Sequence, residues 1–223
     1  VGSTFKLLTA ATALESGFSP GRTFNCNGAI DVLEQTFRCH NRNGHGKLDM
    51  QGALNHSCNP YFISLALEVG GPALAYKAQQ LGFGSRFEAA PGYFTAAGSL
   101  PTLQELSAPA AVANFGFGQG ILTATPVQIA TLVSAIANGG GAVTPRLVAG
   151  TTADGKEITP ATVTYSTRAV FREQAAQQVK DMMINVVEEG SGKNARPQHG
   201  GAGGKTASAQ TGQYKDGKEI VHA

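Results

Sequence analysis

The sequence predicts an α+β domain in which a mostly helical body packs against a small antiparallel sheet. Segments with the apolar spacing of helices outnumber those that read as strands, and no internal repeat is apparent. Near the end of the chain, two extended stretches flank Asp216-Gly217, a dipeptide favoured in tight hairpin turns. At 223 residues, the chain is long enough to bury a substantial hydrophobic core.

Six segments are expected to be helical, because apolar residues recur in them at helical spacing or because a capping residue or a proline marks their start. These segments cover residues 3–15, 49–55, 60–69, 72–81, 126–138 and 167–189. Pro60 and Pro126 each suit the first position of a helix, and Gly139 follows the end of the fifth segment. Ser3 therefore lies in the first turn of the first helix.

The rest of the chain is expected to form loops and short strands. Residues 18–48 contain several glycines and lack helical periodicity, so we expect a loop with short strands there. Residues 82–109 are rich in Gly, Ala, Pro and Ser and are expected to form a long ordered loop. A strand is expected around 143–148. Two more follow Gly203, with Lys205 at the start of an edge strand.

The composition argues against several classes of function. Charged residues make up 14% of the chain, against about 25% in an average soluble domain. A formal net charge of +2, with no basic cluster among aromatic residues, argues against nucleic acid as a partner. The longest apolar stretches, 62–67 and 129–137, are shorter than the roughly 18 residues of a membrane-spanning helix. Because the chain opens directly on a reactive motif without an initiator Met, we expect residues 1–223 to be an excised domain from which upstream sequence has been removed.

Three cysteines, Cys26, Cys39 and Cys58, leave the redox state open. Cys26 and Cys39 enclose a polar, Gly-rich segment and could form a disulfide if the protein lies outside the cytoplasm. The same segment carries His40 and His45, so zinc ligation by Cys26, Cys39, His40 and His45 is a further alternative. No close Cys-x-x-Cys pair supports it, and no metal ligand or cofactor is assigned.

A possible nucleophile and its base lie at the start of the chain. A serine hydroxyl needs a base within hydrogen-bond reach, and Lys6 shares a helix face with Ser3 because the two are three positions apart. The amino end of the helix also offers free N–H groups that stabilise charge on an attacked carbonyl. A serine followed by a lysine at this spacing is also an ordinary solvated helix start, so this pair needs further support.

Two further motifs supply that support. Ser57-Cys58-Asn59 places a hydroxyl and an amide on a constrained turn before Pro60, although a serine or asparagine there could equally be a helix cap. Lys205-Thr206-Ala207-Ser208 follows two glycines, although a lysine on an edge strand is also a common guard against aggregation. The three motifs read Ser-x-x-Lys, Ser-x-Asn and Lys-Thr-x-Ser, in this order along the chain.

This ordered set is similar to the active-site motifs of penicillin-binding proteins and serine β-lactamases. Further stretches resemble class B penicillin-binding proteins in particular, namely residues 116–120, 123–128, 137–140 and 189–192. The likeness spans essentially the whole chain and implies a β-lactamase/transpeptidase-like fold. Residues 38–40, 44–46 and 57–60 resemble the sporulation and cell-division branches of Gram-positive bacteria.

The resemblance implies a D,D-transpeptidase that cross-links peptidoglycan stem peptides and is covalently inhibited by β-lactam antibiotics. Ser3 would attack the penultimate D-alanyl carbonyl, with Lys6 as general base. The resemblance implies roles for the other motif residues as well. Ser57 would relay a proton, and Asn59 would hydrogen-bond to the substrate amide and to Lys6. Lys205 and Thr206 would bind the substrate carboxylate, and the N–H groups of Ser3 and Ser208 would form the oxyanion hole.

The resemblance also implies a setting for the parent protein. It would be anchored at the extracytoplasmic face of the bacterial cell membrane and would associate with the cell-wall synthesis machinery. The sheet of the family receives strands from before the nucleophile helix and from beyond residue 223. The resemblance therefore implies that residues 1–223 are one transpeptidase domain truncated at both ends, and we expect its sheet to be incomplete. Compromised activity and a strand-exchanged dimer are the expected consequences.

Ala207 departs from the family pattern, which usually has glycine there to let the backbone approach substrate. This departure keeps open a catalytically silent β-lactam sensor or interaction domain. A serine β-lactamase is the other alternative. The 148 residues from Ser57 to Lys205 argue against the compact class A enzymes, as does the lack of a Glu-x-x-Leu-Asn element after Ser57.

Overall fold

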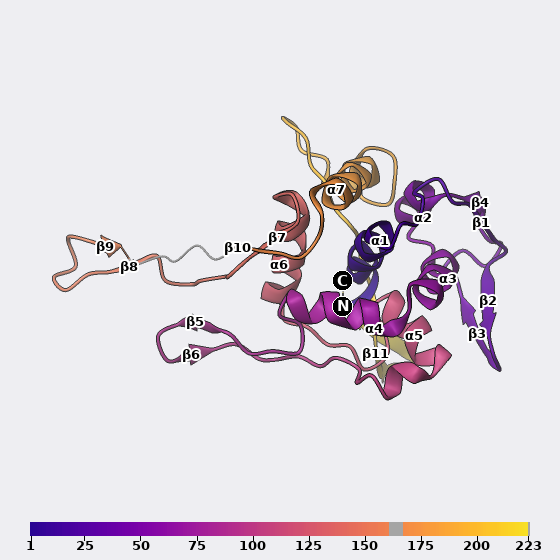
Figure 1. The fold of residues 1–223 in the computed structure, drawn as a ribbon, viewed down its shortest axis with the longest axis horizontal. Coiled ribbons are helices and arrows are strands. Elements are labelled where there is room, and N and C mark those ends of the chain that lie inside the picture. The colour runs from indigo at the N-terminus through magenta and orange to yellow at the C-terminus, as the bar shows by residue number, and fades with distance from the viewer. Residues whose placement is uncertain (161–166, 223) are drawn as a thin grey trace.

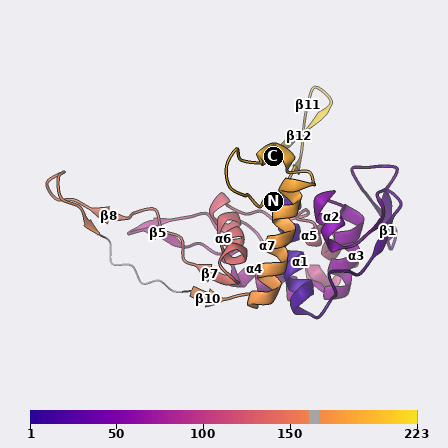
Figure 2. The same cartoon turned by 90° about the horizontal axis from the view of Figure 1, so that it is seen from above.

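The computed structural model describes residues 1–160 and 167–222. Its central element is helix α1 (Lys6–Glu15), which continues from a short 3-10 helix, η1 (Gly2–Phe5). Figures 1 and 2 show α1 within the helical body, where it contacts α3 (Asn59–Val69), α4 (Gly71–Gln80) and α7 (Glu173–Glu188). Every residue of α1 except Glu15 is buried. The candidate nucleophile therefore precedes a helix that forms the centre of the core.

Helix α7 shows how the sequence pattern builds this body. Its buried residues recur at intervals of three and four, which places them on one face of the helix: Ala175, Ala176, Val179, Met182, Met183, Val186 and Val187. This face packs against α1, α2 (Met50–Asn55) and α6 (Pro126–Ala137). At the far end of α1, Glu15 pairs with Lys77 of α4 and with Arg172 just before α7.

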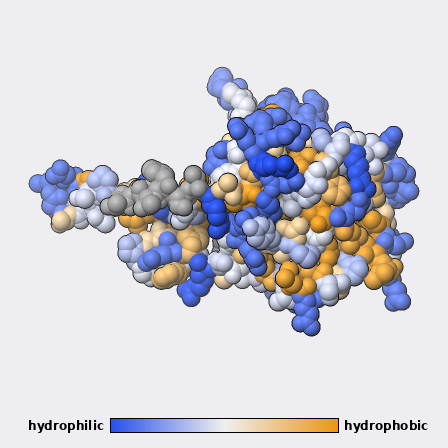
Figure 3. All heavy atoms as spheres, in the orientation of Figure 1, coloured by the Kyte–Doolittle hydropathy of each residue, from blue (hydrophilic) through white to orange (hydrophobic). Residues whose placement is uncertain are grey.

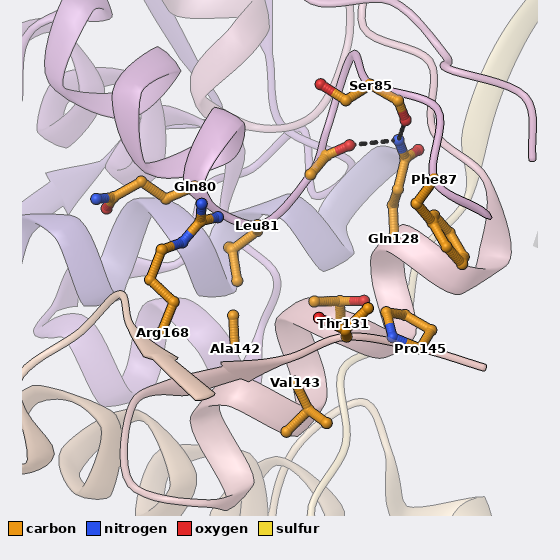
Figure 4. A pocket seen from close by; sticks show the side chains of 12 residues that line it. Gln80, Leu81, Ser85, Phe87, Gln128, Thr131, Ala142, Val143, Pro145 and Arg168 are labelled. Carbon is orange, nitrogen blue, oxygen red and sulfur yellow. Dashed lines mark hydrogen bonds between the residues drawn. The ribbon is translucent and has the colours of Figure 1, made fainter. Parts of the chain in front are cut away.

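Helix α6 begins as its sequence predicts, with Pro126 in the first turn and a capping box between Thr125 and Gln128. The Gln128 amide also donates to the carbonyls of Gly82 at 2.7 Å and Ser85 at 3.3 Å (Figure 4). A cavity of about 220 Å³ lies beside this contact and is lined by residues of α4, α6, β7 and β10. None of the three motifs contributes to this cavity.

The described strands form six separate two-stranded antiparallel sheets. The pairs are β1 (Phe24–Cys26) with β4 (Gly46–Leu48), β2 (Ala29–Val32) with β3 (Gln35–Arg38), β5 (Glu88–Ala90) with β6 (Tyr93–Phe94), β7 (Gly141–Val143) with β10 (Thr167–Ala169), β8 (Gly150–Thr151) with β9 (Thr159–Pro160), and β11 (Ala209–Lys215) with β12 (Lys218–His222). The α+β class is confirmed, with several small pairs in place of one sheet. Figure 1 shows β5–β6 and β8–β9 projecting on one side of the body and β1–β4 and β2–β3 on the other.

Several predicted boundaries are corrected by the structure. The last long helix begins at Glu173, because residues 167–169 pair with β7. The N–H groups of Val170 and Phe171 both donate to Gly140 O, which holds this segment extended. The strand expected at 143–148 is β7, which ends at Val143.

The segment expected to be a long loop contains more regular structure than its composition predicts. It includes the β5–β6 hairpin and a 3-10 helix, η2 (Glu105–Ser107). Helix α5 (Pro109–Gly116), which packs on α3, was not among the helical segments predicted from the sequence.

The last hairpin is confirmed, since Asp216 and Gly217 both have positive φ, of 51° and 73°. Lys205 to Ser208 lie just before β11 rather than at the start of a strand. A strand needs a hydrogen-bonded partner, and the pairing of β11 with β12 begins at Ala209. The lysine motif is therefore irregular backbone between α7 and the hairpin.

The surface is mixed in character. Figure 3 shows apolar residues gathered over the body near α3, α4 and α5, while the tip of the β8–β9 projection is mostly hydrophilic. Large apolar side chains with more than half of their surface exposed include Leu103 and Ile121. In the described part of the chain, the helices are too short or too polar to span a bilayer.

Candidate active site

The three motifs meet at one place, although they lie far apart in the sequence. Lys6 Nζ donates to Ser57 O and to Asn59 Oδ1, both at 2.7 Å, and to Ser57 Oγ at 3.2 Å. Lys205 Nζ donates to the same Ser57 Oγ at 2.9 Å. Ser57 therefore links a lysine of the core helix to a lysine from the other end of the chain.

A cavity of about 410 Å³ lies over this junction. Five of the seven predicted site residues line it, namely Ser3, Ser57, Asn59, Thr206 and Ser208. The other two, Lys6 and Lys205, reach it through their bonds to Ser57. The structure thus brings the whole predicted set together, while the chemical role of each residue stays a prediction.

Lys6 is a fully buried amine, with 0% of its surface exposed. Its pKa is lowered from 10.5 to about 7, mainly by desolvation and also by the nearby Lys205 charge, against an opposing electrostatic effect of Cys58 and Cys39. Near neutral pH, a large fraction of this amine is uncharged and can accept a proton. Lys205 is half-buried, and desolvation lowers its pKa to about 8.

The link between α2 and α3 presents Ser57 and Asn59 in a constrained shape. Ser57 has a φ of 51°, which is uncommon for a residue with a side chain. The backbone around it is held, since Ser57 N–H donates to Leu54 O at 3.2 Å and Cys58 N–H to Ala53 O at 2.9 Å. Cys58 is the N-cap of α3, with the expected Pro60 in the first turn.

Ser3 is positioned by close backbone contacts. Gly2 N–H donates to Gly118 O at 2.8 Å, and a Cβ at Gly118 would lie 2.0 Å from Gly2 O. Gly118 thus has a role in backbone geometry, because any side chain there would collide with Gly2. A Cβ at Gly2 would lie 3.3 Å from the backbone of Ser208, so the segments of the two predicted oxyanion-hole amides are adjacent.

Hydrogen bonds within the lysine motif (205–208) and to Ser191 hold the motif in place. Lys205 Nζ also donates to Thr206 O at 2.9 Å, and Thr206 Oγ1 lies 2.8 Å from Ser191 Oγ. Ala207 lines the cavity, so the extra methyl group stands where substrate would approach. Ser191 lies in a stretch that resembles the family, but the sequence alone did not indicate that it would contact Thr206.

The cavity has further lining residues that sequence reasoning missed. They are Arg38, Cys39, His40, Arg42, His56, Phe117, Gln119 and Ser191. Four of these belong to the 38–42 segment, which the sequence indicated as a loop with possible metal ligands and a subfamily resemblance, but not as part of the active site. Two arginines and two histidines give this side of the cavity a basic character that suits an anionic ligand.

The cysteines do not form the disulfide that was considered for Cys26 and Cys39. All three cysteines are buried free thiols. The sulfur atoms of Cys26 and Cys39 share their surroundings with a third thiol, Cys58, and with His45. His40 is not part of this group, although its Nδ1 lies 3.9 Å from Cys39 Sγ.

The comparisons with known proteins agree with this geometry. Residues 1–222 match the family model described as the penicillin binding protein transpeptidase domain. Stage V sporulation protein D of Bacillus subtilis is 34% identical over 230 residues, which cover 98% of this chain and 34% of that protein. This similarity agrees with the sporulation-type branch that residues 38–46 and 57–60 indicated.

Two solved structures extend the likeness to three dimensions. The D,D-transpeptidase domain of peptidoglycan glycosyltransferase from Eggerthella lenta has a TM-score of 0.86 at 26% identity, over 98% of this chain and 54% of that one. Penicillin binding protein 3 of Mycobacterium tuberculosis, complexed with aztreonam, has a TM-score of 0.83 at 27% identity, over 98% and 50%. The chain therefore spans about half of each solved protein and about a third of the curated relative.

Proposed function

Because the chain belongs to the family of penicillin-binding protein transpeptidase domains, we propose that it acts as a D,D-transpeptidase through an acyl-enzyme on Ser3. The observation that carries this proposal is the junction at Ser57, where the buried amine of Lys6 and the amine of Lys205 bond to one hydroxyl beside Ser3. A lysine with a pKa of about 7 is suited to general-base catalysis near neutral pH.

In this mechanism, neutral Lys6 removes the proton of Ser3, and Ser3 Oγ attacks the penultimate D-alanyl carbonyl. The N–H groups of Ser3 and Ser208 stabilise the tetrahedral oxyanion. Its C–N bond then breaks, and the terminal D-alanine leaves with a proton relayed from Lys6 through Ser57. The amine of a second stem peptide attacks the Ser3 ester, so that a new amide forms and Ser3 Oγ recovers its proton.

Substrate binding follows from the remaining groups. The ammonium of Lys205 and the hydroxyl of Thr206 hold the terminal carboxylate, which the basic wall of the cavity also attracts. Asn59 keeps Lys6 in place through its Oδ1 and offers its amide N–H to the substrate backbone. A β-lactam carries the same carbonyl and carboxylate and would acylate the same serine.

Intact mass spectrometry of this chain after incubation with benzylpenicillin tests the proposal. We expect an increase of one drug molecule, located on Ser3 by peptide mapping and absent from Ser3→Ala. An exposed serine provides a matched control, and Ser107→Ala is expected to acylate like the wild type. An adduct that persists in Ser3→Ala, or a mass that never increases, would contradict the assignment of Ser3.

Ala207 favours a second candidate, a β-lactam sensor that is acylated but does not cross-link. A reaction with a D-Ala-D-Ala peptide substrate and an acceptor amine distinguishes the two functions. A transpeptidase forms the cross-linked amide, whereas a sensor forms the penicillin adduct and no peptide product. Rapid turnover of nitrocefin in place of one stoichiometric burst would instead favour a β-lactamase.

The cellular setting is part of the same proposal. We infer an extracytoplasmic site of action, because peptidoglycan stem peptides and the β-lactams that reach them are found there. A membrane anchor in the parent protein, and partners in the cell-wall synthesis machinery, would follow from that location. The strand-exchanged dimer also stays a prediction, and sedimentation velocity of the isolated chain tests it.

A further inference from the structure

Three thiols and one imidazole converge at one wall of the active-site cavity, which Cys39 helps to line. The ligand atoms of Cys26, Cys39, His45 and Cys58 all lie within 4.8 Å of one another. The three cysteines are each at most 1% exposed. A buried cysteine by itself behaves as a small apolar side chain. Apolar packing does not account for an imidazole Nδ1 at 3.6 Å from Cys39 Sγ.

Backbone contacts hold the loops that carry the first three of these groups. His45 N–H donates to Cys26 O at 3.0 Å, and Cys39 N–H donates to Gly28 O at 2.8 Å. The loops approach so closely that a Cβ at Gly44 would lie 2.1 Å from Cys26 O. Glycine at this position therefore permits an arrangement that brings the side chains of Cys26, Cys39 and His45 together.

The fourth group comes from a different part of the chain. Cys58 is the N-cap of α3, and its side chain points into the same cluster from between Ser57 and Asn59. The cluster thus connects the β1–β4 pair to the link that carries two of the candidate catalytic groups.

We propose that Cys26, Cys39, His45 and Cys58 bind one Zn²⁺ ion. Three thiolates and one imidazole are a common ligand set of closed, tetrahedral zinc sites. With Zn–S of about 2.3 Å and Zn–N of about 2.0–2.1 Å, tetrahedral ligand atoms are separated by about 3.5–3.8 Å. The observed separations need only a small contraction to reach these values. Binding replaces the thiol protons, because the thiolate is the ligand.

A disulfide explains the cluster less well. A disulfide has an S–S distance of about 2.05 Å and joins two sulfur atoms. Any bridge within the cluster would leave one buried thiol unpaired and would give His45 no partner. Zinc uses all four groups. The cluster also differs from the set considered from the sequence, since Cys58 takes the place of His40.

The metal would also position catalytic groups, and this second part rests on the proposed function. Because Cys58 lies between Ser57 and Asn59, a bond from its sulfur to Zn²⁺ fixes the link that holds Lys6 through three acceptors. The strained φ of Ser57 would then be maintained by the metal as well as by backbone bonds. The zinc ion itself contacts no substrate and is a structural element of the active site.

The metal content of the chain tests the first part. The chain is purified with its thiols reduced, supplied with Zn²⁺, and dialysed without chelator. We expect one zinc per chain by atomic spectrometry. The Co²⁺-loaded chain should show the thiolate charge-transfer absorption and the intense visible bands of a tetrahedral site. A chain that keeps no zinc and shows no such Co²⁺ spectrum would overturn the site.

Two matched variants identify the ligands. Cys58→Ser is expected to lose the zinc, whereas His40→Ala, which removes the neighbouring imidazole, is expected to retain it. Loss in His40→Ala with retention in Cys58→Ser would overturn the ligand set in favour of the one drawn from the sequence. If Cys58→Ser does not fold, His45→Ala changes a half-buried side chain and is expected to lose the zinc while His40→Ala retains it. Loss of zinc in both histidine variants would favour the set considered from the sequence.

Acylation by benzylpenicillin tests the positioning role separately. We expect removal of zinc by a chelator to slow acylation at least about tenfold, as loss of supporting groups around a site commonly does, and added Zn²⁺ to restore the rate. Acylation that is unchanged without zinc would overturn the positioning role and leave the metal site standing. A chain that binds zinc but is never acylated would instead contradict the proposed function alone.

Discussion

The two lysines of the candidate site come from opposite kinds of structure. Lys6 belongs to α1, a helix surrounded by other helices and buried along nearly its whole length. Lys205 belongs to irregular backbone between α7 and the last hairpin, and it is half-buried. Both side chains nevertheless meet at Ser57 Oγ. In the proposed mechanism, a buried helix of the core thus supplies the base, and a less enclosed segment supplies the positive charge that binds the substrate carboxylate.

The largest effect is expected where the buried amine is removed. Lys6→Met keeps the length and apolar stem of the side chain but cannot accept a proton, so acylation should slow by about 10²–10⁴-fold. Stopped acylation reactions read by intact mass measure this rate. Lys156→Met, on the exposed β8–β9 projection, is the matched control and should acylate normally. Near-normal acylation of a folded Lys6→Met protein would show that another group is the base.

A smaller effect is expected at the less enclosed lysine. Lys205→Ala removes a charged hydrogen bond to the substrate carboxylate, worth about 1.5–3 kcal/mol, so kcat/KM should fall by roughly 10–100-fold. Lys205→Arg keeps the charge and should recover part of the loss. A substrate whose terminal carboxylate is replaced by an amide should be insensitive to Lys205→Ala. Equal losses for both substrates would show that Lys205 acts on Ser57 instead.

The pH dependence of acylation also distinguishes the two lysines, because the proposed mechanism requires them to be in opposite protonation states. Lys6 works as the neutral amine, so acylation should rise with pH through its pKa of about 7. Lys205 works as the ammonium, so acylation should fall above its pKa of about 8. The plot of acylation rate against pH should therefore be bell-shaped with a narrow maximum. On each side of the maximum, the rate should fall about tenfold per pH unit.

Lys205→Arg separates the limbs of this profile, since arginine stays charged over the whole range. The falling limb should disappear in this variant while the rising limb remains. In Lys205→Ala, the rising limb should move to higher pH, because the charge of Lys205 helps to lower the pKa of Lys6. A falling limb that survives in Lys205→Arg would have to come from another group.

The smallest effect is expected from restoring the family glycine. Ala207→Gly removes one methyl group from the cavity wall, so acylation by benzylpenicillin should become faster, by a few-fold. Ala202→Gly, earlier in the same irregular segment, controls for added backbone freedom. Slower acylation in Ala207→Gly would indicate that the methyl group instead orders this segment.

Much of the helical body could be predicted, because its signals are local. Pro126 with the Thr125–Gln128 capping box marks the start of α6, and the spacing of Val179, Met183 and Val186 marks the buried face of α7. Residues 167–169 were predicted as helix and form β10, because strand pairing with β7 depends on a partner far away in the sequence.

The sequence by itself determined which chemical groups are available and in what order. Three motifs define the candidate site: a serine three positions before a lysine, a Ser-x-Asn link and a lysine near the end of the chain. They can be recognised without knowing the conformation of the loops between them. Tertiary structure decided how these groups are paired. Burial of α1 lowers the pKa of Lys6. Packing of the α2–α3 link against the β1–β4 loops adds Cys58 to the group formed with Cys26, Cys39 and His45, a group that His40 does not join. The burial of Lys6 and the proximity of the cysteines depend on contacts between segments that are distant in the sequence. Such contacts cannot be read from local sequence patterns.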